Sequence, residues 1–251
     1  MTDTPRETRV LDAVAPLVDS LLDDFDVVEL LTDLTERCTQ LLDVGAAGLL
    51  LVDPRHHLHL IAATSEASRE LELFQLQSEE GPCLDCYATG HPVTVADLPG
   101  EQQRWPRFVP AATDAGYASV HAVPMRAAGT TLGALGLFGN DPGELTTADL
   151  LVAQTLAHVA SVAIVQEHSP TPVTVPPRLS NALTGRLVIE QAKGYLRESL
   201  DVSIPAAFDL LRSYARTHQI HLTEVARRLL TDPDARGTIL ADLRHSNVRS
   251  S

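Results

Sequence analysis

Apolar positions in the first two thirds of the chain alternate between helical and strand spacing. A helical pattern covers residues 27–44. Short apolar runs of strand length follow it, at residues 46–53, 58–64, 91–97, 118–125 and 131–139. A second long helical pattern, over about 147–167, begins where Thr146 and Asp149 have the spacing of a capping box.

The order of these elements predicts the fold class of this part of the chain. The first two strands flank the turn segment DPRHH and the last two flank RAAGT, so each pair predicts an antiparallel hairpin. Helical segments precede, separate and follow the hairpins. We therefore expect an α+β domain, in which helices pack against an antiparallel sheet.

A proline-rich segment, HSPTPVTVPP, occupies residues 168–177 and has four prolines in ten residues. Proline lacks a backbone N–H and disfavours a helical conformation in the residue before it. The segment is therefore predicted to be an extended linker between two domains.

The pattern after the linker is helical throughout. Three helices are predicted, at about 178–199, 204–217 and 223–230. Ser203 and Thr223 are the expected N-caps of the second and third. Three short helices with brief connections form a small all-α bundle. A short helix around residues 238–243 and a frayed end are expected beyond it.

The chain thus divides into five parts. They are an N-terminal helical extension, the α+β domain, the linker, the helical domain and a C-terminal tail, at residues 1–25, 26–168, 169–177, 178–235 and 236–251.

Charge separates the two domains as well. From Arg178 onward there are eleven Lys and Arg and eight Asp and Glu, a net charge of +3, whereas the first 177 residues carry a net charge of −17. An acidic domain is repelled by a phosphate backbone, while a basic one can bind it. The asymmetry indicates that the two domains have different partners.

Composition excludes several classes of protein. With 44% hydrophobic and 21% charged residues, the 251-residue chain has globular values. Its apolar runs are too short for a membrane span and its N-terminus lacks an apolar signal core, so we expect a cytoplasmic protein with no membrane partner. Three cysteines, an odd number, argue against a disulfide framework.

The segment GRLVIEQAKGYLRESL, residues 185–200, contains the single lysine of the chain. On a helix, Lys193 shares one face with Arg186 and Arg197, and an adjacent apolar arc can face the bundle core. Glu190 lies close to this row and neutralises part of its charge. The row is either a phosphate-binding surface or a solvated face.

Two further features extend this pattern. Arg212 and Arg216 lie one turn apart on the second predicted helix. Gly194, beside Lys193, costs about 1 kcal/mol in a helix interior relative to alanine. A close-packed helix, a nearby nucleic-acid backbone or simple tolerance would each account for this glycine.

Residues 181–230 closely resemble the ANTAR domain, a three-helix RNA-binding module of bacterial transcription antiterminators. The matching elements include Arg186, the IEQAKG core at 189–194 and the LTEVARRLL ending. The resemblance implies that a dimer binds paired hairpin loops in nascent RNA and so prevents a terminator hairpin from forming. Unpaired loop bases expose readable edges, and cations contact the phosphates around them. The expected RNA-binding residues are Arg186, Lys193, Arg197, Arg212 and Arg216.

Residues 26–168 resemble a GAF domain, a sensor fold of sheet and helices. The resemblance rests on element order and on EEGPCLDCYATGHPVTVADL at 79–98. The asparagine–lysine–phenylalanine–aspartate–glutamate set of cyclic-nucleotide-binding GAF domains is not found, and residues 1–177 contain no lysine, so cyclic GMP is disfavoured. The resemblance implies a small-molecule or redox signal for this domain, while the cofactor remains unknown from the sequence.

The motif GPCLDC contains Cys83 and Cys86. Pro82 can start a helix, whose dipole would favour a thiolate at Cys83, as in a redox switch. A zinc site would need further ligands, such as Cys38 or His91. Two small buried thiols in a packed turn are the third interpretation.

Other polar groups do not indicate catalysis. His56, His57 and His59 lie in a predicted hairpin turn and should be exposed to solvent. The acidic run at 21–30 lies between helical patterns rather than after a strand, which argues against a receiver-domain phosphoacceptor. We assign no catalytic residue and no metal ligand.

The sequence thus predicts an RNA-binding antitermination regulator, not an enzyme, in which a GAF-like sensor controls an ANTAR-like module. Two alternatives stay open. One is a DNA-binding regulator, since a small basic helical bundle can enter a major groove. The other is a redox- or ligand-sensing protein whose helical bundle only dimerises.

Overall fold

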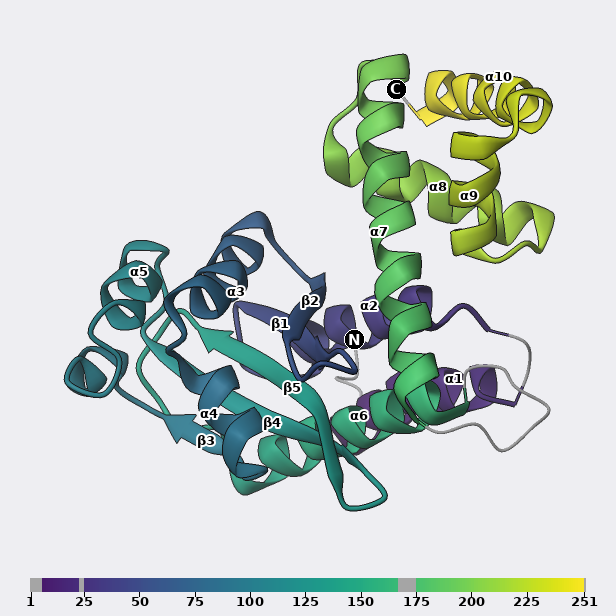
Figure 1. Ribbon diagram of the computed structural model, residues 1–251. Coiled ribbons are helices and arrows are strands. Elements are labelled where there is room, and N and C mark those ends of the chain that lie inside the picture. The colour runs from purple at the N-terminus through teal and green to yellow at the C-terminus, as the bar shows by residue number, and fades with distance from the viewer. Residues whose placement is uncertain (1–5, 23–24, 167–174, 251) are drawn as a thin grey trace, which may run out of the picture. The chain divides into compact units, whose positions relative to one another are not determined.

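The computed structural model of the chain describes residues 6–22, 25–166 and 175–250 (Figure 1). The chain forms two compact units, which divide between Ser180 and Asn181. We call them the N-terminal unit and the C-terminal unit and describe each by itself.

The N-terminal unit is built on a five-stranded antiparallel sheet with strand order β2-β1-β5-β4-β3. The strands are β1 (Ala46–Val52), β2 (Leu58–Ala63), β3 (Val93–Val95), β4 (Ser119–Ala127) and β5 (Thr130–Gly139). The two predicted hairpins, β1–β2 and β4–β5, are confirmed, and β1 and β5 pair at the centre of the sheet.

Helices cover both faces of this sheet (Figure 1). They are α1 (Arg6–Ser20), α2 (Val27–Leu41), α3 (Glu66–Ser78), α4 (Pro82–Thr89), α5 (Phe108–Asp114) and α6 (Thr147–Gln166), with a short 3-10 helix at Leu98–Glu101. Helices α2 and α6 pack on one face, while α3 and α4 pack on the other. Every residue of β1 is buried because the strand is covered on both sides. The predicted α+β class is confirmed.

Side-chain caps fix the starts of the helices. Asp26 accepts hydrogen bonds from the backbone N–H groups of Val28 (3.0 Å) and Glu29 (3.1 Å), so this carboxylate of the acidic run is the N-cap of α2. The predicted capping box of α6 is present, since the Asp149 N–H donates to Thr146 Oγ1 (3.1 Å) and the Thr146 N–H donates to Asp149 Oδ2 (3.2 Å).

Helix α6 is unusually apolar. Among the described residues, it is the one helix whose length and hydropathy match a membrane span. Half of its most apolar window is buried, and the helix packs on β4 and α2. Its apolar residues therefore serve, at least in part, as core of the N-terminal unit.

The C-terminal unit is all-helical. Its helices are α7 (Val175–Leu200), α8 (Ile204–His218), α9 (Leu222–Thr231) and α10 (Pro233–Ser250). The first three are the predicted bundle, and Ser203 caps α8 as expected, because its Oγ accepts from the Ala206 N–H (3.3 Å). The shared core is formed by apolar residues that include Ile189, Leu196, Leu211, Val225 and Leu229.

Two details of the prediction are wrong at helix starts. Residues 175–177 were predicted to be part of the extended linker, but they form the first turn of α7. Proline is tolerated there because the N–H groups of a first turn have no intrahelical acceptor. The remainder of the predicted linker, 169–174, lies outside the described residues. Thr223 is not an N-cap: α9 begins one residue earlier, after His221, which makes no side-chain cap.

The C-terminal segment is more ordered than predicted. Instead of a short helix and a frayed end, α10 is an 18-residue helix that packs on α8 and α9 and buries Ile239 and Leu243. Arg236 joins α10 to α9, since its guanidinium donates hydrogen bonds to the carbonyl oxygens of Leu229 (2.7 Å) and Leu230 (2.5 Å) at the end of α9. A fourth helix therefore completes the bundle.

Candidate nucleic-acid interface and buried thiol cluster

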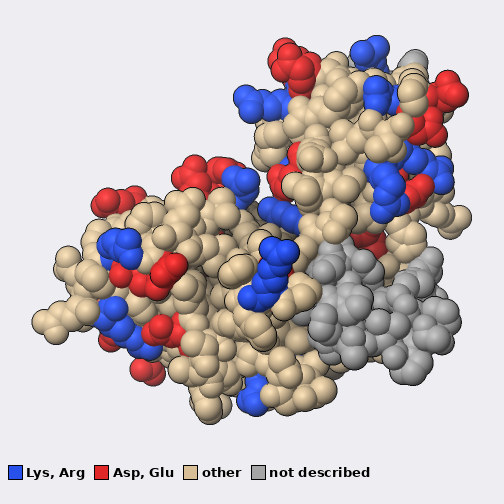
Figure 2. All heavy atoms as spheres, viewed as in Figure 1, with Lys and Arg blue, Asp and Glu red and all other residues tan. Residues whose placement is uncertain are grey.

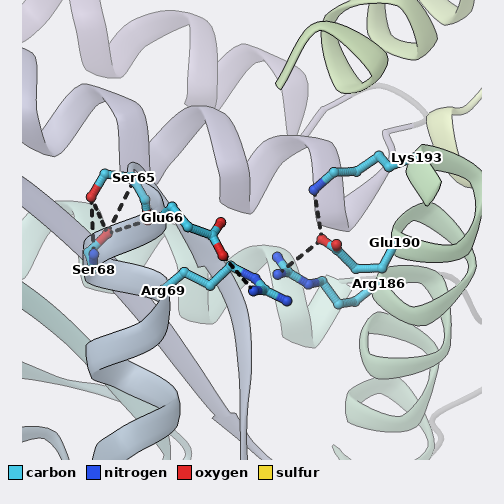
Figure 3. Close-up of polar contacts among 7 residues, drawn as sticks. All are labelled: Ser65, Glu66, Ser68, Arg69, Arg186, Glu190 and Lys193. Carbon is cyan, nitrogen blue, oxygen red and sulfur yellow. Dashed lines mark hydrogen bonds and ion pairs between the residues drawn. The ribbon is translucent and has the colours of Figure 1, made fainter. Parts of the chain in front are cut away.

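The cationic row of α7 is organised by one carboxylate (Figure 3). Glu190 Oε1 lies 3.1 Å from Arg186 Nη2 and 2.9 Å from Lys193 Nζ. The three side chains occupy one face of α7 at spacings of four and three residues, as the sequence predicts. The shared carboxylate offsets the repulsion between the two cations and leaves the group a net charge of +1.

Helix α8 contributes to the same surface through an aromatic ring. Lys193 Nζ lies 5.6 Å from the centroid of the Phe208 ring, and Arg212 Cζ lies 6.0 Å from it. Both distances fall within the range of a cation–π interaction. Phe208 thereby joins the row of α7 to the row of α8. We call Arg186, Glu190, Lys193, Phe208 and Arg212 the basic surface.

The other two predicted RNA-binding residues lie at its margin. Arg197 follows Lys193 by one turn of α7, and Arg216 follows Arg212 by one turn of α8. Both are exposed. The structure thus brings Lys193 and Arg212 together at one ring, links Arg186 to Lys193 through Glu190, and extends the row with the remaining two predicted cations.

Cations elsewhere on the unit are also held by local partners. Arg227 and Arg228 both pair with Glu224, and Arg236 stacks over Tyr195 of α7 with its Cζ 5.5 Å from the ring centroid. Figure 2 shows cationic and anionic side chains interspersed on the face of this unit that is in view. Charge on the bundle is therefore distributed in local pairs, and Glu190 is the anion of the basic surface.

Gly194 lies next to this surface and is exposed. A Cβ atom built on it would meet no heavy atom within 4 Å. Among the described residues, then, no helix packs closely enough to require glycine, and that interpretation is wrong. The open space above Gly194 leaves room for a molecule that is not part of the chain.

Cys83 lies in the first turn of α4, directly after Pro82, as predicted. The thiol is fully buried, however, and burial, together with the neighbouring Glu72 and Cys86, holds the pKa of Cys83 well above its usual range. Burial also raises the pKa of Cys86 to about 12. The predicted thiolate is therefore not favoured in this state, because the loss of hydration outweighs the helix dipole.

A buried carboxyl group completes this cluster. Glu72 Oε2 accepts from Gln75 Nε2 (2.8 Å), Glu72 Oε1 lies 3.6 Å from Cys83 Sγ, and Gln75 Oε1 accepts from the Cys83 N–H (3.0 Å). Burial raises the pKa of Glu72 to about 8, against the opposing effect of the Cys83 hydrogen bond. Glu72 is therefore a neutral acid at pH 7.

The sheet makes room for this acid with two paired glycines. Gly48 of β1 and Gly136 of β5 are direct cross-strand partners. A Cβ on either would approach Glu72 Oε1 to 2.5 Å, and one on Gly136 would also approach Cys83 Sγ to 2.8 Å. Glycine inside a strand marks such a close approach. The sequence prediction missed Glu72, Gln75 and Phe208, and the two mid-strand glycines were the signal that pointed to the first of them.

One of the hairpin histidines, His56, lines a cleft in the N-terminal unit. His56, His57 and His59 are exposed, as predicted. A cleft of about 460 Å³ lies at this end of the sheet, between the two hairpin turns and α4, and Tyr87 Oη lies 3.5 Å from His56 Nδ1 at its wall. Within the described ranges, no three His, Cys, Asp or Glu side chains are placed to hold a metal ion. The zinc interpretation thus has no ligand set there.

Comparison with known proteins agrees with this architecture. The GAF domain model matches residues 26–165 and the ANTAR domain model matches residues 178–230. No curated protein matches the chain.

Solved structures match the fold of the N-terminal unit. A free methionine-R-sulfoxide reductase from Neisseria meningitidis, solved with its substrate, is 18% identical with a TM-score of 0.52 and covers 66% of this chain and 95% of its own. The GAF domain of an Acinetobacter phosphoenolpyruvate-protein phosphotransferase is 16% identical with a TM-score of 0.51 and covers 65% and 97%. At these identities the likeness shows the fold alone.

The buried acid predicts a pH dependence of stability. The native state keeps the Glu72 proton up to about pH 8, whereas the unfolded chain loses it near the ordinary value of 4.5. Stability is therefore fully present below pH 4.5 and falls as pH rises to 8, by at most about 1.4 kcal/mol per pH unit. Glu72→Gln should remove this slope, measured by urea unfolding at several pH values through the fluorescence of Trp105.

Glu70→Gln is the matched control, because Glu70 lies on the same helix and is exposed. His121, whose pKa is lowered by burial, contributes an opposite slope in every variant, so the difference from the wild-type chain isolates Glu72. Equal slopes in Glu72→Gln and the wild-type chain would contradict a neutral buried acid.

Proposed function

The chain belongs to the GAF domain family and contains an ANTAR domain at residues 178–230, and on this basis we propose that it is a transcription antitermination regulator that binds hairpin loops in nascent RNA. The observation that carries the proposal is the basic surface, in which Lys193 of α7 and Arg212 of α8 lie over one aromatic ring and Arg186 is linked to Lys193 through Glu190. Cations beside an aromatic ring suit phosphates that flank unpaired bases.

Binding proceeds by exchange of ion pairs. Arg186 and Lys193 are held by Glu190 in the free protein, so an RNA phosphate takes the place of the carboxylate or joins it. The two cations are already positioned, which lowers the entropic cost of fixing them. The N-terminal unit, with most of the chain's acidic residues, is repelled by RNA and leaves the binding to the C-terminal unit.

A homodimer is part of the proposal, with one ANTAR domain for each hairpin. Helices α1 and α6 contact each other and expose large apolar side chains. These include Leu11 and Val18 on α1 and Leu151 and Val162 on α6. A second copy would shield them from water, which favours association. We place the regulator in the cytoplasm, where nascent transcripts are found.

The GAF domain supplies the signal in this proposal. The cleft beside Tyr87 has the size of a small-molecule site and is the candidate binding site for the signal molecule. Cys83 and Cys86 are buried with raised pKa values, which favours structural thiols over a reactive redox pair. A reductase activity such as that of the Neisseria enzyme therefore has no support from the cysteine chemistry.

The first test is binding of the purified full chain to a tandem-hairpin RNA, with matched duplex DNA beside it, over a salt series. We expect RNA to be preferred, and Lys193→Ala and Arg186→Ala each to weaken binding about tenfold, because each removes a charged contact. The slope of log affinity against log salt should fall by about one for each variant.

Arg244→Ala is the control, since Arg244 is exposed and lies on α10, a helix that contributes no residue to the basic surface. Equal or stronger binding to DNA would favour the DNA-binding alternative and reject this proposal. Absence of RNA binding by a folded wild-type chain would leave the bundle as a dimerisation element.

Glu190→Gln tests the shared carboxylate. Removing this anion takes away the carboxylate that competes with RNA phosphates for Arg186 and Lys193, so RNA affinity should rise about threefold at low salt and the gain should shrink as salt screens the charges. Glu198→Gln, an exposed position on the same helix, should change affinity little. Weaker binding by Glu190→Gln would show that the carboxylate is needed to position the cations.

Gly194→Ala tests the open space beside the basic surface. Alanine should stabilise α7 by about 1 kcal/mol because it lowers the conformational entropy of the unfolded chain and meets no neighbour. If an RNA backbone lies over Gly194, affinity should fall while the melting temperature rises. A rise in both quantities would exclude a close approach of RNA at this position.

A further inference from the structure

Phe208 is an unusual residue for its position. It lies in the second turn of α8 and is partly exposed, although its neighbours Ala207 and Leu211 are buried. Arg212 follows it by one turn. Phenylalanine is normally placed where its ring is removed from water. Here the ring lies at the edge of the core, where α7 and α8 meet.

The ring is also the centre of the basic surface. Lys193 Nζ at 5.6 Å and Arg212 Cζ at 6.0 Å approach it from two different helices. Both distances are close to the outer limit of a cation–π interaction, so each contact is weak and easily exchanged. A flat group that stacks on the ring can displace either cation, and the displaced cation stays within reach of an anion attached to that group.

A nucleotide with an unpaired base has this combination of a flat ring and an adjoining phosphate. We infer that Phe208 is the residue on which an unpaired RNA loop base stacks, with Lys193 and Arg212 bound to the phosphates on either side. The inference rests on the proposed function and names the part of the RNA that the basic surface receives. Base pairs in a helix cannot stack on Phe208 in this way, so the contact selects loops over duplexes.

Stacking and phosphate binding differ in their response to salt. Removing a phosphate contact reduces the salt slope, whereas a stacking contact releases no counterion. Phe208→Leu keeps the apolar contact with the core but loses the ring. It should weaken binding of the full chain to the tandem-hairpin RNA about tenfold at every salt concentration, with the salt slope unchanged.

Phe208→Tyr keeps the ring and should recover most of the affinity that Phe208→Leu loses. Lys193→Ala should show the opposite signature, a reduced salt slope. Replacing the loop nucleotides one at a time by abasic sites should identify one position whose loss weakens wild-type binding about tenfold and has no further effect in Phe208→Leu.

The outcomes separate this inference from the proposed function. RNA binding by the wild-type chain with no loss in Phe208→Leu would overturn the stacking role and leave the RNA-binding proposal intact. A loss accompanied by the reduced salt slope of Lys193→Ala would also overturn it, since the ring would then only hold the cations. If Phe208→Leu does not fold, quenching of 2-aminopurine at the identified loop position by the wild-type chain supports stacking, and unquenched fluorescence at every loop position rejects it. No RNA binding by the wild-type chain would reject both proposals.

Discussion

The contact between Lys193 and the Phe208 ring makes one surface out of two helices. Without it, α7 would carry a row of cations paired with Glu190, and α8 a separate row beginning at Arg212. Each row alone resembles the solvated face of an ordinary amphipathic helix. Because the ring lies between them, the two rows share an aromatic centre with cations on both sides. The proposed recognition of loop RNA depends on this arrangement.

A second constraint operates in the N-terminal unit, where burial decides the chemistry. The position of Cys83 after Pro82 favours a thiolate when the helix dipole alone is considered. The full burial of the thiol and of Glu72 has the larger effect, and both groups remain protonated. Reactivity at this cluster would require α3 or α4 to move away from the sheet. In this state the cluster is therefore packed as part of the core of the N-terminal unit.

The sequence predicted most of the elements because their signals are local. The DPRHH and RAAGT turns were enough to predict both hairpins. Ser203 and the Thr146–Asp149 pair were enough to predict where two helices begin. The length of helix α10 was underestimated because Gly237 and a polar stretch weaken its periodicity, while its stability comes from Ile239, Leu243 and Arg236 packing on other helices. Thr223 was misassigned because a good capping residue lay one position inside the helix. Tertiary contacts of this kind are not visible in a local pattern.

The residues that define the two candidate sites share a physical property: each departs from a local rule. Gly48 and Gly136 weaken strand interiors, Gly194 weakens a helix, Glu72 is a buried acid and Phe208 is an aromatic ring left partly in water. Such departures persist where a function or a close contact compensates for their cost. For the paired glycines the compensation is visible, since the Glu72 carboxyl occupies the space. For Phe208 the compensation within the chain comes from Lys193 and Arg212, which lie over its ring. At Gly194 a Cβ would meet open space, so the glycine is either simply tolerated at the helix surface or accounted for by the RNA of the proposed function.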